Sequence, residues 1–378
     1  MSIGEGIRDR ILRGEAPDPS GLAQVVETEA VRLGSAGADL ARSELAADLL
    51  GAGPLEPHLA DASVTDVLVN GDGAIWVDRG RGLERVADAS LGPEAARRLA
   101  VRLAGQAGRR LDESQPWVDG LLPGGVRLHA VLPPIVDRGA HLSLRVPRQA
   151  SSRLADLQAT GMFGAETGEL LHRMVECRVS LLITGGTGSG KTTLLGALLA
   201  EVPDNERIVL VEDVRELAVA HPHVVRLQGR AANVEGRGEV TLVQLVRQAL
   251  RMRPDRLVVG EVRGAEVREL LAGLNTGHEG GCGTVHANSP GDLVARMEAL
   301  GALAGLGRAA VRAQLASAVQ AAVHVHRAPD GRRVESLSVL LNGEHGPSVA
   351  SALVCATGER GPGWGQLRRL LQLPAGRP

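Results

Sequence analysis

The sequence predicts an α/β fold, in which a domain with a mainly parallel sheet follows a smaller α+β domain and a helical N-terminal segment. Three observations predict it. Apolar runs of strand length alternate with amphipathic runs of helix length from residue 166 to residue 321. The hydrophobic period is different between residues 51 and 147, where short strand patterns recur. A glycine-rich turn stands at the first strand-to-helix junction of the alternating stretch. Such alternation implies right-handed crossovers and parallel strands.

The first 147 residues divide into a helical segment and a small domain. Residues 1–50 are expected to be helical, because apolar residues in LAQVVETEAVRL recur near helical spacing and a Gly-Pro pair ends the segment. Over residues 51–147, VTDVLVNG and AIWVD predict short strands around a Gly-Asp-Gly turn. GPEAARRLAVRLAGQAG predicts a helix, and VRLHAVLPP and HLSLRV predict two more strands. This mixture indicates an α+β domain.

The remainder of the chain predicts a linker, a larger domain and a tail. Residues 148–165 are polar and contain glycine, which is typical of a linker. The domain over residues 166–342 is expected to contain helices 166–177, 191–201, 239–252, 264–276, 290–304 and 308–321, and strands 179–184, 207–212, 256–261 and 283–287. VESLSVL is a candidate for a further strand. Residues 343–378 are rich in Gly and Pro, so we expect a C-terminal tail that frays.

The composition indicates how many domains the chain can form and argues against a strongly charged protein that binds nucleic acid or acidic membranes through its net charge. The chain has 378 residues, 44% of them hydrophobic, which is enough for two or three domains with their own cores. A formal net charge of −2 gives no global attraction to nucleic acid or to acidic membranes. One Phe, three Trp and no Tyr leave almost no platforms for stacking exposed bases. Three scattered cysteines and the lack of an apolar run of about 18 residues favour a reducing, cytoplasmic location without a membrane span.

The stretch LLITGGTGSGKTTLL carries the phosphate-loop pattern: Gly185, four residues, then Gly190, Lys191 and Thr192. Glycines let backbone N–H groups turn inward and cradle phosphates, and the helix that begins here adds its positive end. Lys191 is expected to reach the outer phosphates, and the Thr192 hydroxyl to bind Mg²⁺. A glycine-rich turn with a surface lysine is the weaker alternative, because a strand enters the loop and a helix leaves it. A dinucleotide-binding turn fails because Lys191 stands where the third glycine is needed.

Two apolar strands end on carboxylates. RIVLVEDVREL delivers Glu212 and Asp213, with Glu216 following, and RLVVGEVRG delivers Glu261, with Arg263 following. Ligands bind at the carboxyl ends of parallel strands. A carboxylate there can orient or deprotonate an attacking water while Mg²⁺ bridges the phosphates. Solvated strand ends are the alternative, and two such ends beside a phosphate loop make it the weaker one.

Arginines also gather on one predicted helix face. Arg247 and Arg251 are four residues apart in LVRQALRMRPD, and Arg253 follows near the helix end. Two interpretations stay open. The arginines form a solvated surface, or they bind phosphate or an acidic face of a neighbouring subunit.

GHEGGCGTVHANS places His278, Cys282 and His286 four residues apart, which looks like a spacing of metal ligands. A structural zinc site wants four ligands. The stretch offers three nitrogen or sulfur candidates, and they straddle a glycine run and a predicted strand. We therefore favour His286, near the strand end, as a phosphate-facing histidine. His278 is expected to have an inter-subunit or supporting role, and Cys282 to be a small core residue.

Several motifs keep a fixed order from about Leu49 to Arg333: GAGPLEPHLADASVTDVLVNG, AGRRLDESQPWVDGLLPGGVRLHAVLPP, ITGGTGSGKTTLL, RIVLVEDVREL, LVRQALRMRPDRLVVGEVRG and NTGHEGGCGTVHANSP. In these the chain resembles the traffic ATPases of type II and type IV secretion, within them the branch of tight-adherence (Flp) pilus and conjugal-transfer-like ATPases. The resemblance implies a RecA-like P-loop ATPase domain, an N-terminal sensing domain and a hexameric ring of identical subunits. It also implies that ATP is held between these domains and at subunit boundaries.

The resemblance further assigns roles to residues of this chain. The Walker A loop that binds ATP corresponds to Gly185, Gly186, Thr187, Gly188, Ser189, Gly190, Lys191 and Thr192, with Thr193 beside it. The Asp box contains Glu212, Asp213 and Glu216, and Mg²⁺ is expected on Thr192 and, through water, on Glu212. Leu257 to Glu261 match an atypical Walker B with Glu261 as the catalytic glutamate, and Gly260 stands where many P-loop enzymes have an Asp. Gly277 to Asn288 match the His box, and Arg127 and Arg145 match nucleotide-contacting arginines. The expected catalytic set is Glu261, Lys191, Glu212, His286 and Arg263.

The leading hypothesis is therefore an ATP-hydrolysing motor that drives pilin or substrate export. Such a motor is cytoplasmic and lies at the inner face of the cell membrane, against an inner-membrane platform protein. The alternative is a RecA-like nucleic-acid motor in DNA transfer or uptake, which predicts a basic stripe or stacking aromatics. The net charge of −2 and the scarcity of aromatics argue against direct binding of nucleic acid. A regulatory protein without turnover is disfavoured by the intact Lys191, Thr192 and Glu261.

Overall fold

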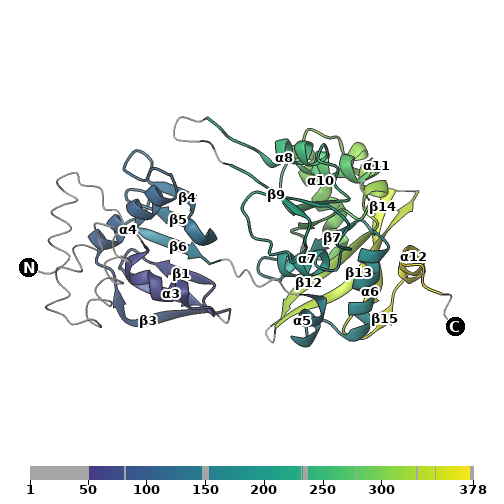
Figure 1. Cartoon of the computed structure of the whole chain (residues 1–378), viewed down its shortest axis with the longest axis horizontal. Helices are drawn as coiled ribbons and strands as arrows, with labels where there is room; N and C mark the ends of the chain where they lie inside the picture. The colour runs from purple at the N-terminus through teal and green to yellow at the C-terminus, as the bar shows by residue number, and fades with distance from the viewer. Residues whose placement is uncertain are drawn as a thin grey trace, which may run out of the picture. The chain divides into compact units, whose positions relative to one another are not determined.

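The structure is a computed structural model that describes residues 51–80, 82–146, 153–230, 232, 237–277, 279–328, 331–344 and 346–374. The helical segment expected over residues 1–50 lies outside this part of the chain. The chain divides into two compact units, Met1–Arg148 and Gln149–Pro378 (Figure 1). In the described ranges, no helix is long and apolar enough to cross a membrane.

The first unit is built on a sheet in the order β3-β2-β1-β6-β5-β4, in which all neighbouring strands are antiparallel. Its elements are η1 (Gly53–Leu55), α3 (Glu56–Ala60), β1 (Asp66–Val69), β2 (Ala74–Asp78), β3 (Leu83–Ser90), α4 (Pro93–Gln106), β4 (Trp117–Leu121), η2 (Pro123–Gly125), β5 (Arg127–Val131) and β6 (His141–Arg145). The strands predicted in VTDVLVNG, AIWVD, VRLHAVLPP and HLSLRV are confirmed, as is the helix α4. β3 was not predicted, because its polar and small residues are mostly exposed and give no clear pattern.

Helix α4 covers this sheet through one apolar stripe. Ala96, Leu99, Ala100 and Leu103 are buried at helical spacing, and they join the inward-facing residues of the strands in a single core. Pro93 occupies the first turn, where its missing N–H costs no hydrogen bond. The aliphatic core expected from the composition is confirmed here.

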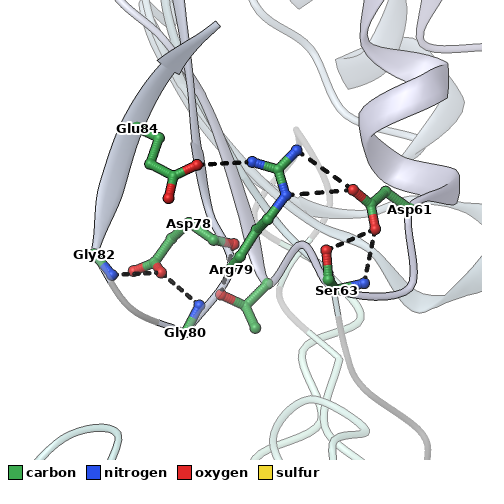
Figure 2. A network of polar contacts seen from close by, with 8 residues as sticks. Asp61, Ser63, Asp78, Arg79, Gly80, Gly82 and Glu84 are labelled. Atoms are coloured by element: carbon green, nitrogen blue, oxygen red, sulfur yellow. Dashed lines mark hydrogen bonds and ion pairs between the residues drawn. The ribbon is translucent and has the colours of Figure 1, made fainter.

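The first unit keeps charged residues at its surface. In Figure 2, Arg79 lies between Asp61 and Glu84. Its Nη1 donates to Glu84 Oε2 at 3.0 Å, and its Nη2 reaches Asp61 Oδ2 at 3.4 Å. Hydrogen bonds from the Ser63 hydroxyl and backbone lower the pKa of Asp61. These groups are exposed, so the network positions the loops around β2 and contributes little to stability.

The second unit is built on a mixed sheet in the order β15-β14-β13-β12-β7-β11-β10-β8-β9. Strands β12, β7, β11, β10, β8 and β9 are parallel to their neighbours in that run, whereas β13, β14 and β15 continue it in antiparallel fashion. The strands are β7 (Leu181–Thr184), β8 (Ile208–Glu212), β9 (Val224–Gln228), β10 (Arg256–Val262), β11 (Cys282–Val285), β12 (Ala321–Ala328), β13 (Gly331–Gly343), β14 (Gly346–Val354) and β15 (Glu359–Arg360). The predicted α/β fold is therefore confirmed.

Helices cover both faces of this sheet. β7 shows why: Leu181 and Ile183 pack into one apolar core, and Leu182 between them packs into the other. The first core includes residues of α5 (Leu154–Ala159), α6 (Ala165–Glu176), α7 (Lys191–Leu199) and α12 (Trp364–Leu370). The second includes residues of α8 (Leu242–Ala249), α9 (Val267–Leu274), α10 (Leu293–Leu303) and α11 (Arg308–Ala318), with the turn η3 (Pro290–Asp292) before α10.

Charged residues are buried at the amino ends of the parallel strands. Arg256, 2% exposed, donates from Nε to Glu206 Oε2 at 2.6 Å and from Nη2 to the Val175 carbonyl at 2.9 Å. Arg178 donates to the other Glu206 oxygen at 2.9 Å. Burial alone would raise the pKa of Glu206, but Arg256 and Arg178 hold it below its ordinary value. Gly280 makes room for the arginine, because a Cβ there would lie 2.1 Å from Arg256 Nη1.

Two expectations about segments are wrong. Helix α5 lies within the predicted linker 148–165, and its Leu154 and Leu157 are buried in the core of the second unit. Residues after Asn342 do not fray throughout, because β14 pairs with β13 and the buried Leu367 of α12 packs into the same core. In both segments a few apolar residues anchor a polar, glycine-containing stretch.

Candidate functional site

The phosphate-loop pattern forms the connection between β7 and α7, as predicted. Gly190 has φ +100°, a left-handed conformation that favours glycine. A side chain at Gly185 would place its Cβ 2.2 Å from the Val325 carbonyl of β12. Ser189 donates its hydroxyl to the Gly186 carbonyl at 2.9 Å. The loop is therefore held tightly against the sheet, while Gly186 and Thr187 are exposed.

Lys191 opens α7 and turns back over this loop. Its Nζ donates to the carbonyls of Gly185 at 3.0 Å and Gly186 at 2.7 Å. Burial lowers the pKa of the Lys191 ammonium, against the opposing charge of Glu261. Thr192, the next residue, is half-buried at the same helix start, and Thr193 is exposed. A buried ammonium held only by loop carbonyls can exchange them for the oxygens of a phosphate.

Glu261 and His286 come together beside the loop. They lie at the carboxyl ends of the adjacent strands β10 and β11, and His286 Nε2 is 3.1 Å from Glu261 Oε1. Burial and the charge of Lys191 lower the pKa of His286, and Glu261 opposes that shift. The Thr284 hydroxyl donates to the Gly260 carbonyl at 2.7 Å and ties the two strands together. Lys191 influences the electrostatics of both groups, while the catalytic roles of Glu261 and His286 stay predictions.

Glu212 is buried at the end of the next strand, β8. Its Oε1 accepts hydrogen bonds from the backbone N–H groups of Glu216 at 2.9 Å and Leu217 at 2.8 Å. Its Oε2 lies 3.8 Å from Arg226 Nη1. Burial raises the pKa of Glu212, although these hydrogen bonds and the charge of Arg226 oppose the rise. Its assignments to catalysis and to magnesium stay predictions.

The same side chain lies against Gly260, which the resemblance assigns to an atypical Walker B. A Cβ at Gly260 would lie 2.9 Å from Glu212 Cγ. Glu212 therefore occupies the space that a side chain at position 260 needs. A side chain at position 260 would require Glu212 to move, and the carboxylate of Glu212 comes from the neighbouring strand β8.

The arginines predicted to act near the site have partners within the chain. Arg263 pairs with Asp213, which brings two of the predicted residues together from different strand ends. Arg247 of α8 donates twice to Glu269 Oε1 of α9, at 3.1 and 2.7 Å. Of the two interpretations of Arg247, the structure supports neither in full, because this arginine joins two helices of its own subunit.

The remaining predicted residues fall into three groups. Arg127 and Arg145 are Cα partners on adjacent strands of the first unit, and their assignment to the nucleotide stays a prediction. His278 lies outside the described residues. Cys282 is buried in the core, as expected, and burial raises the pKa of its thiol to about 12, which keeps it protonated. Within the described ranges, no cluster of three His, Cys, Asp or Glu side chains is arranged to hold a metal.

Two features beside the site were not predicted. One is Arg226 of β9, a strand whose pattern is interrupted by that arginine. The other is the β12–β13 tip, where Arg332 donates to the Gly188 carbonyl of the phosphate loop at 3.0 Å. The signal for it was present in HVHRAPDGRRVES, because a Pro-Asp-Gly turn between alternating residues is typical of a hairpin.

Comparisons with known proteins address the family and the fold. A sequence model described as "Type II/IV secretion system protein" matches residues 48–344. A putative conjugal transfer protein of Mycobacterium tuberculosis is 58% identical over 307 residues, which cover 79% of this chain and 87% of that protein. The conjugal transfer protein TrbB of Rhizobium radiobacter is 33% identical over 285 residues, or 74% of this chain and 84% of TrbB. Among solved structures, the Legionella pneumophila ATPase DotB is 19% identical, covers 77% of this chain and 80% of its own, and has a TM-score of 0.53.

Proposed function

This chain belongs to the type II/IV secretion system protein family, and from that premise we propose that it is a RecA-like P-loop ATPase that powers a secretion, pilus-assembly or transfer machine. The observation that carries the proposal is the meeting of Lys191, Glu261 and His286 beside one phosphate loop. The alternative, a glycine-rich turn with a surface lysine, does not explain why the Lys191 ammonium is buried or why it lies close enough to Glu261 to feel its charge.

In this proposal the loop from Gly185 to Thr193 binds the phosphates of ATP. The backbone N–H groups of the loop and the start of α7 supply donors. Lys191 leaves the carbonyls of Gly185 and Gly186 and pairs with the outer phosphates. Burial disfavours the charged form of Lys191 and lowers its pKa. A phosphate carries negative charge and therefore stabilises the buried ammonium better than two neutral carbonyls do, which favours the exchange.

Glu261 is proposed to orient the attacking water and to accept its proton as the bond to the γ-phosphate forms. The leaving oxygen is that of ADP, and its charge is stabilised by Lys191. His286, whose Nε2 is 3.1 Å from Glu261 Oε1, is proposed to exchange that carboxylate for the γ-phosphate and to respond when the phosphate leaves. Arg263, paired with Asp213, supports this edge of the site.

The oxygen donors beside the loop suit a hard cation such as Mg²⁺. Thr192 would hold it directly and Glu212 through water. Bound Mg²⁺ would neutralise charge on the phosphates during transfer. Glu212 fits this role because one of its carboxylate oxygens accepts no backbone hydrogen bond.

The motor is proposed to work as a ring of identical subunits, expected to be a hexamer, on an inner-membrane platform protein. Nucleotide binding and release would drive domain motion, because closure around a ligand gives each nucleotide state a distinct geometry. Two relatives are named conjugal transfer proteins, so a machine that transfers DNA is the second candidate for the assembly that this chain serves. The chain itself has a net charge of −2, which disfavours direct binding of nucleic acid.

Two variants test the catalytic part of the proposal. Glu261→Gln should bind ATP while turnover falls roughly 10²- to 10⁴-fold, the usual contribution of a general base. Lys191→Ala should lose ATP binding or hydrolysis. Glu344→Gln, an exposed carboxylate outside the site, is the matched control and should behave as wild type. Near-wild-type hydrolysis in Glu261→Gln would remove Glu261 from the catalytic role.

A separate measurement addresses the alternative motor. ATP hydrolysis by the wild-type chain should be indifferent to added single-stranded DNA. A strong stimulation that disappears as salt is raised would instead support direct action on nucleic acid.

A further inference from the structure

Arg226 projects from the last strand in the sheet order of the second unit, beside Glu212. β9 follows β8 at the end of that order, and the Cα partner of Arg226 on β8 is Leu210. Partner residues on neighbouring strands share a face, as do residues two apart on one strand, so Arg226 and Glu212 lie on the same face. The Arg226 side chain is only 21% exposed. A charge so largely withdrawn from water must be compensated by polar partners.

Arg226 and Glu212 together hold one turn of the backbone. The chain turns after β8, and Glu212 Oε1 accepts hydrogen bonds from the backbone N–H groups of Glu216 and Leu217. Arg226 Nη1 donates to the Leu217 carbonyl at 2.6 Å. The backbone of Leu217 is therefore held at its N–H by the carboxylate and at its C=O by the guanidinium. The Leu217 side chain anchors the same turn in the apolar core.

The same guanidinium also faces the second oxygen of Glu212. Arg226 Nη1 lies 3.8 Å from Glu212 Oε2, which is within the range of an ion pair but longer than a hydrogen bond. Burial raises the pKa of Glu212, and the charge of Arg226 opposes that rise. Arg226 thus supplies positive charge to a buried carboxylate without itself forming a hydrogen bond to Oε2.

The turn that Arg226 holds carries predicted site residues. It begins at Asp213, which pairs with Arg263 beyond the end of β10. Asp213 also lies against the end of β9, because a Cβ at Gly229 would be 2.9 Å from Asp213 Oδ1. A shift of this turn would therefore displace Glu212 and Asp213 together.

We propose that Arg226 is a positioning residue of the ATPase site, which holds Glu212 and the turn over residues 213–217 in the arrangement that hydrolysis requires. This inference rests on the proposed function, because it gives Glu212 a part in hydrolysis. Arg226 acts through Glu212 and makes no contact of its own with the nucleotide. Its loss should slow the chemical step and leave nucleotide binding intact, whereas loss of a merely structural arginine would impair both through a less stable domain.

Arg226→Met separates these two roles, because methionine retains much of the side-chain volume without the charge. We expect kcat for ATP hydrolysis to fall roughly 10- to 100-fold, the usual cost of removing a residue that orients a functional group. The dissociation constant for ADP, measured by calorimetry on the full chain, should change by less than about twofold. Arg226→Lys restores the charge and should recover part of kcat.

A double-mutant cycle tests whether Arg226 acts through Glu212. Glu212→Gln should lower kcat on its own, and Arg226→Met added to it should lower kcat by less than about twofold more. Two independent losses that multiply would overturn the proposal, because Arg226 would then act by another route.

Amide hydrogen exchange reports on the turn without a measurement of activity. In Arg226→Met, the amides of Glu216 and Leu217 should exchange roughly tenfold faster, because their acceptor is less firmly held. Arg215→Gln is the matched control, since Arg215 carries the same charge in the same turn and is exposed. It should keep wild-type exchange and wild-type kcat.

Three results would overturn the positioning role. They are wild-type kcat or wild-type amide exchange in Arg226→Met, an equal loss of kcat in Arg215→Gln, and a fall of kcat in Arg226→Met that is matched by lost ADP binding and a lower melting temperature. A wild-type chain that does not hydrolyse ATP would refute the ATPase function as well. Wild-type hydrolysis with an unaffected Arg226→Met would refute this inference alone.

Discussion

Charged side chains are buried at both ends of the parallel strands in the second unit, but the number of polar partners that they have differs between the two ends. At the amino end, Glu206 has an arginine on each carboxylate oxygen, and Arg256 also reaches a backbone carbonyl. At the carboxyl end, the Lys191 ammonium has only two loop carbonyls.

The pKa shifts follow this difference. Paired arginines hold the pKa of Glu206 below its ordinary value in spite of burial. Burial is the largest influence at the other end, where it lowers the pKa of Lys191 and raises that of Glu212. A buried charge with a full set of partners is costly to disrupt, whereas one that keeps a burial penalty is available to a ligand.

The largest expected effect concerns the amino end. Arg256→Met should lower the free energy of unfolding by about 3–5 kcal/mol, because it leaves Glu206 buried with half of its partners. Urea denaturation followed by circular dichroism would measure it. Arg178→Met, at a half-exposed position, should cost clearly less. If Arg256→Met and the wild type have equal free energies of unfolding, the conclusion that Arg256 compensates the buried charge of Glu206 is wrong.

A glycine beside the same arginine should have the next largest effect. Gly280→Ala should lower the free energy of unfolding by about 1–3 kcal/mol, because the new Cβ would displace Arg256. Gly277→Ala is the control that measures the cost of backbone strain without a collision. Gly277 also has a positive φ, but nothing lies within 4 Å of its Cβ position. If both variants lose the same amount in thermal melting, strain alone explains the loss.

A smaller effect is expected from pH near the phosphate loop. His324 is buried, with Nδ1 2.9 Å from the Thr184 hydroxyl, and burial lowers its pKa. The folded chain therefore binds a proton less readily than the unfolded chain. Stability from this group is present above about pH 6.5 and is lost as pH falls through the lowered pKa. His324→Gln should flatten the decline of melting temperature between pH 7 and roughly pH 5. An unchanged decline would show that His324 does not contribute to it.

The smallest effect sharpens the comparison at the carboxyl end. Lys191→Met should not lower the free energy of unfolding, because methionine fills a similar volume without the burial penalty of the ammonium. The urea experiment used for Arg256→Met measures it under the same conditions. A loss above about 1 kcal/mol would show that Lys191 stabilises the fold in its own right.

The sequence predicted the parts of the site that are local in the chain. The loop before Lys191 is a strand–turn–helix pattern, which adjacent residues determine. Glu261 and His286 were placed because apolar strands precede them, and parallel strands bring their carboxyl ends to one edge. For the phosphate loop, Glu261 and His286, the sequence pattern alone supports the prediction, and the structure supplies the distances between the side chains.

The parts that depend on strand order were not predicted. β12 was not predicted. The helix expected over residues 308–321 reaches only its first residue, Ala321, because RAAVRAQLASAV continues to that point without a breaking residue, and residues 322–328 were assigned to no element. Only the alternation of Val323 and Val325 with histidines indicated a strand. The contact between Glu212 and Gly260 was equally hidden, since nothing in either segment says that β8 and β10 are neighbours.

Lys191 is the only lysine among the 378 residues. An amine-selective isotopic label would therefore give one side-chain resonance, and that resonance would come from the centre of the phosphate loop. Its chemical shift would follow the ammonium as it leaves the carbonyls of Gly185 and Gly186. The chain thus carries its own spectroscopic reporter of loop occupancy, which can be read in the assembled machine without introducing a mutation.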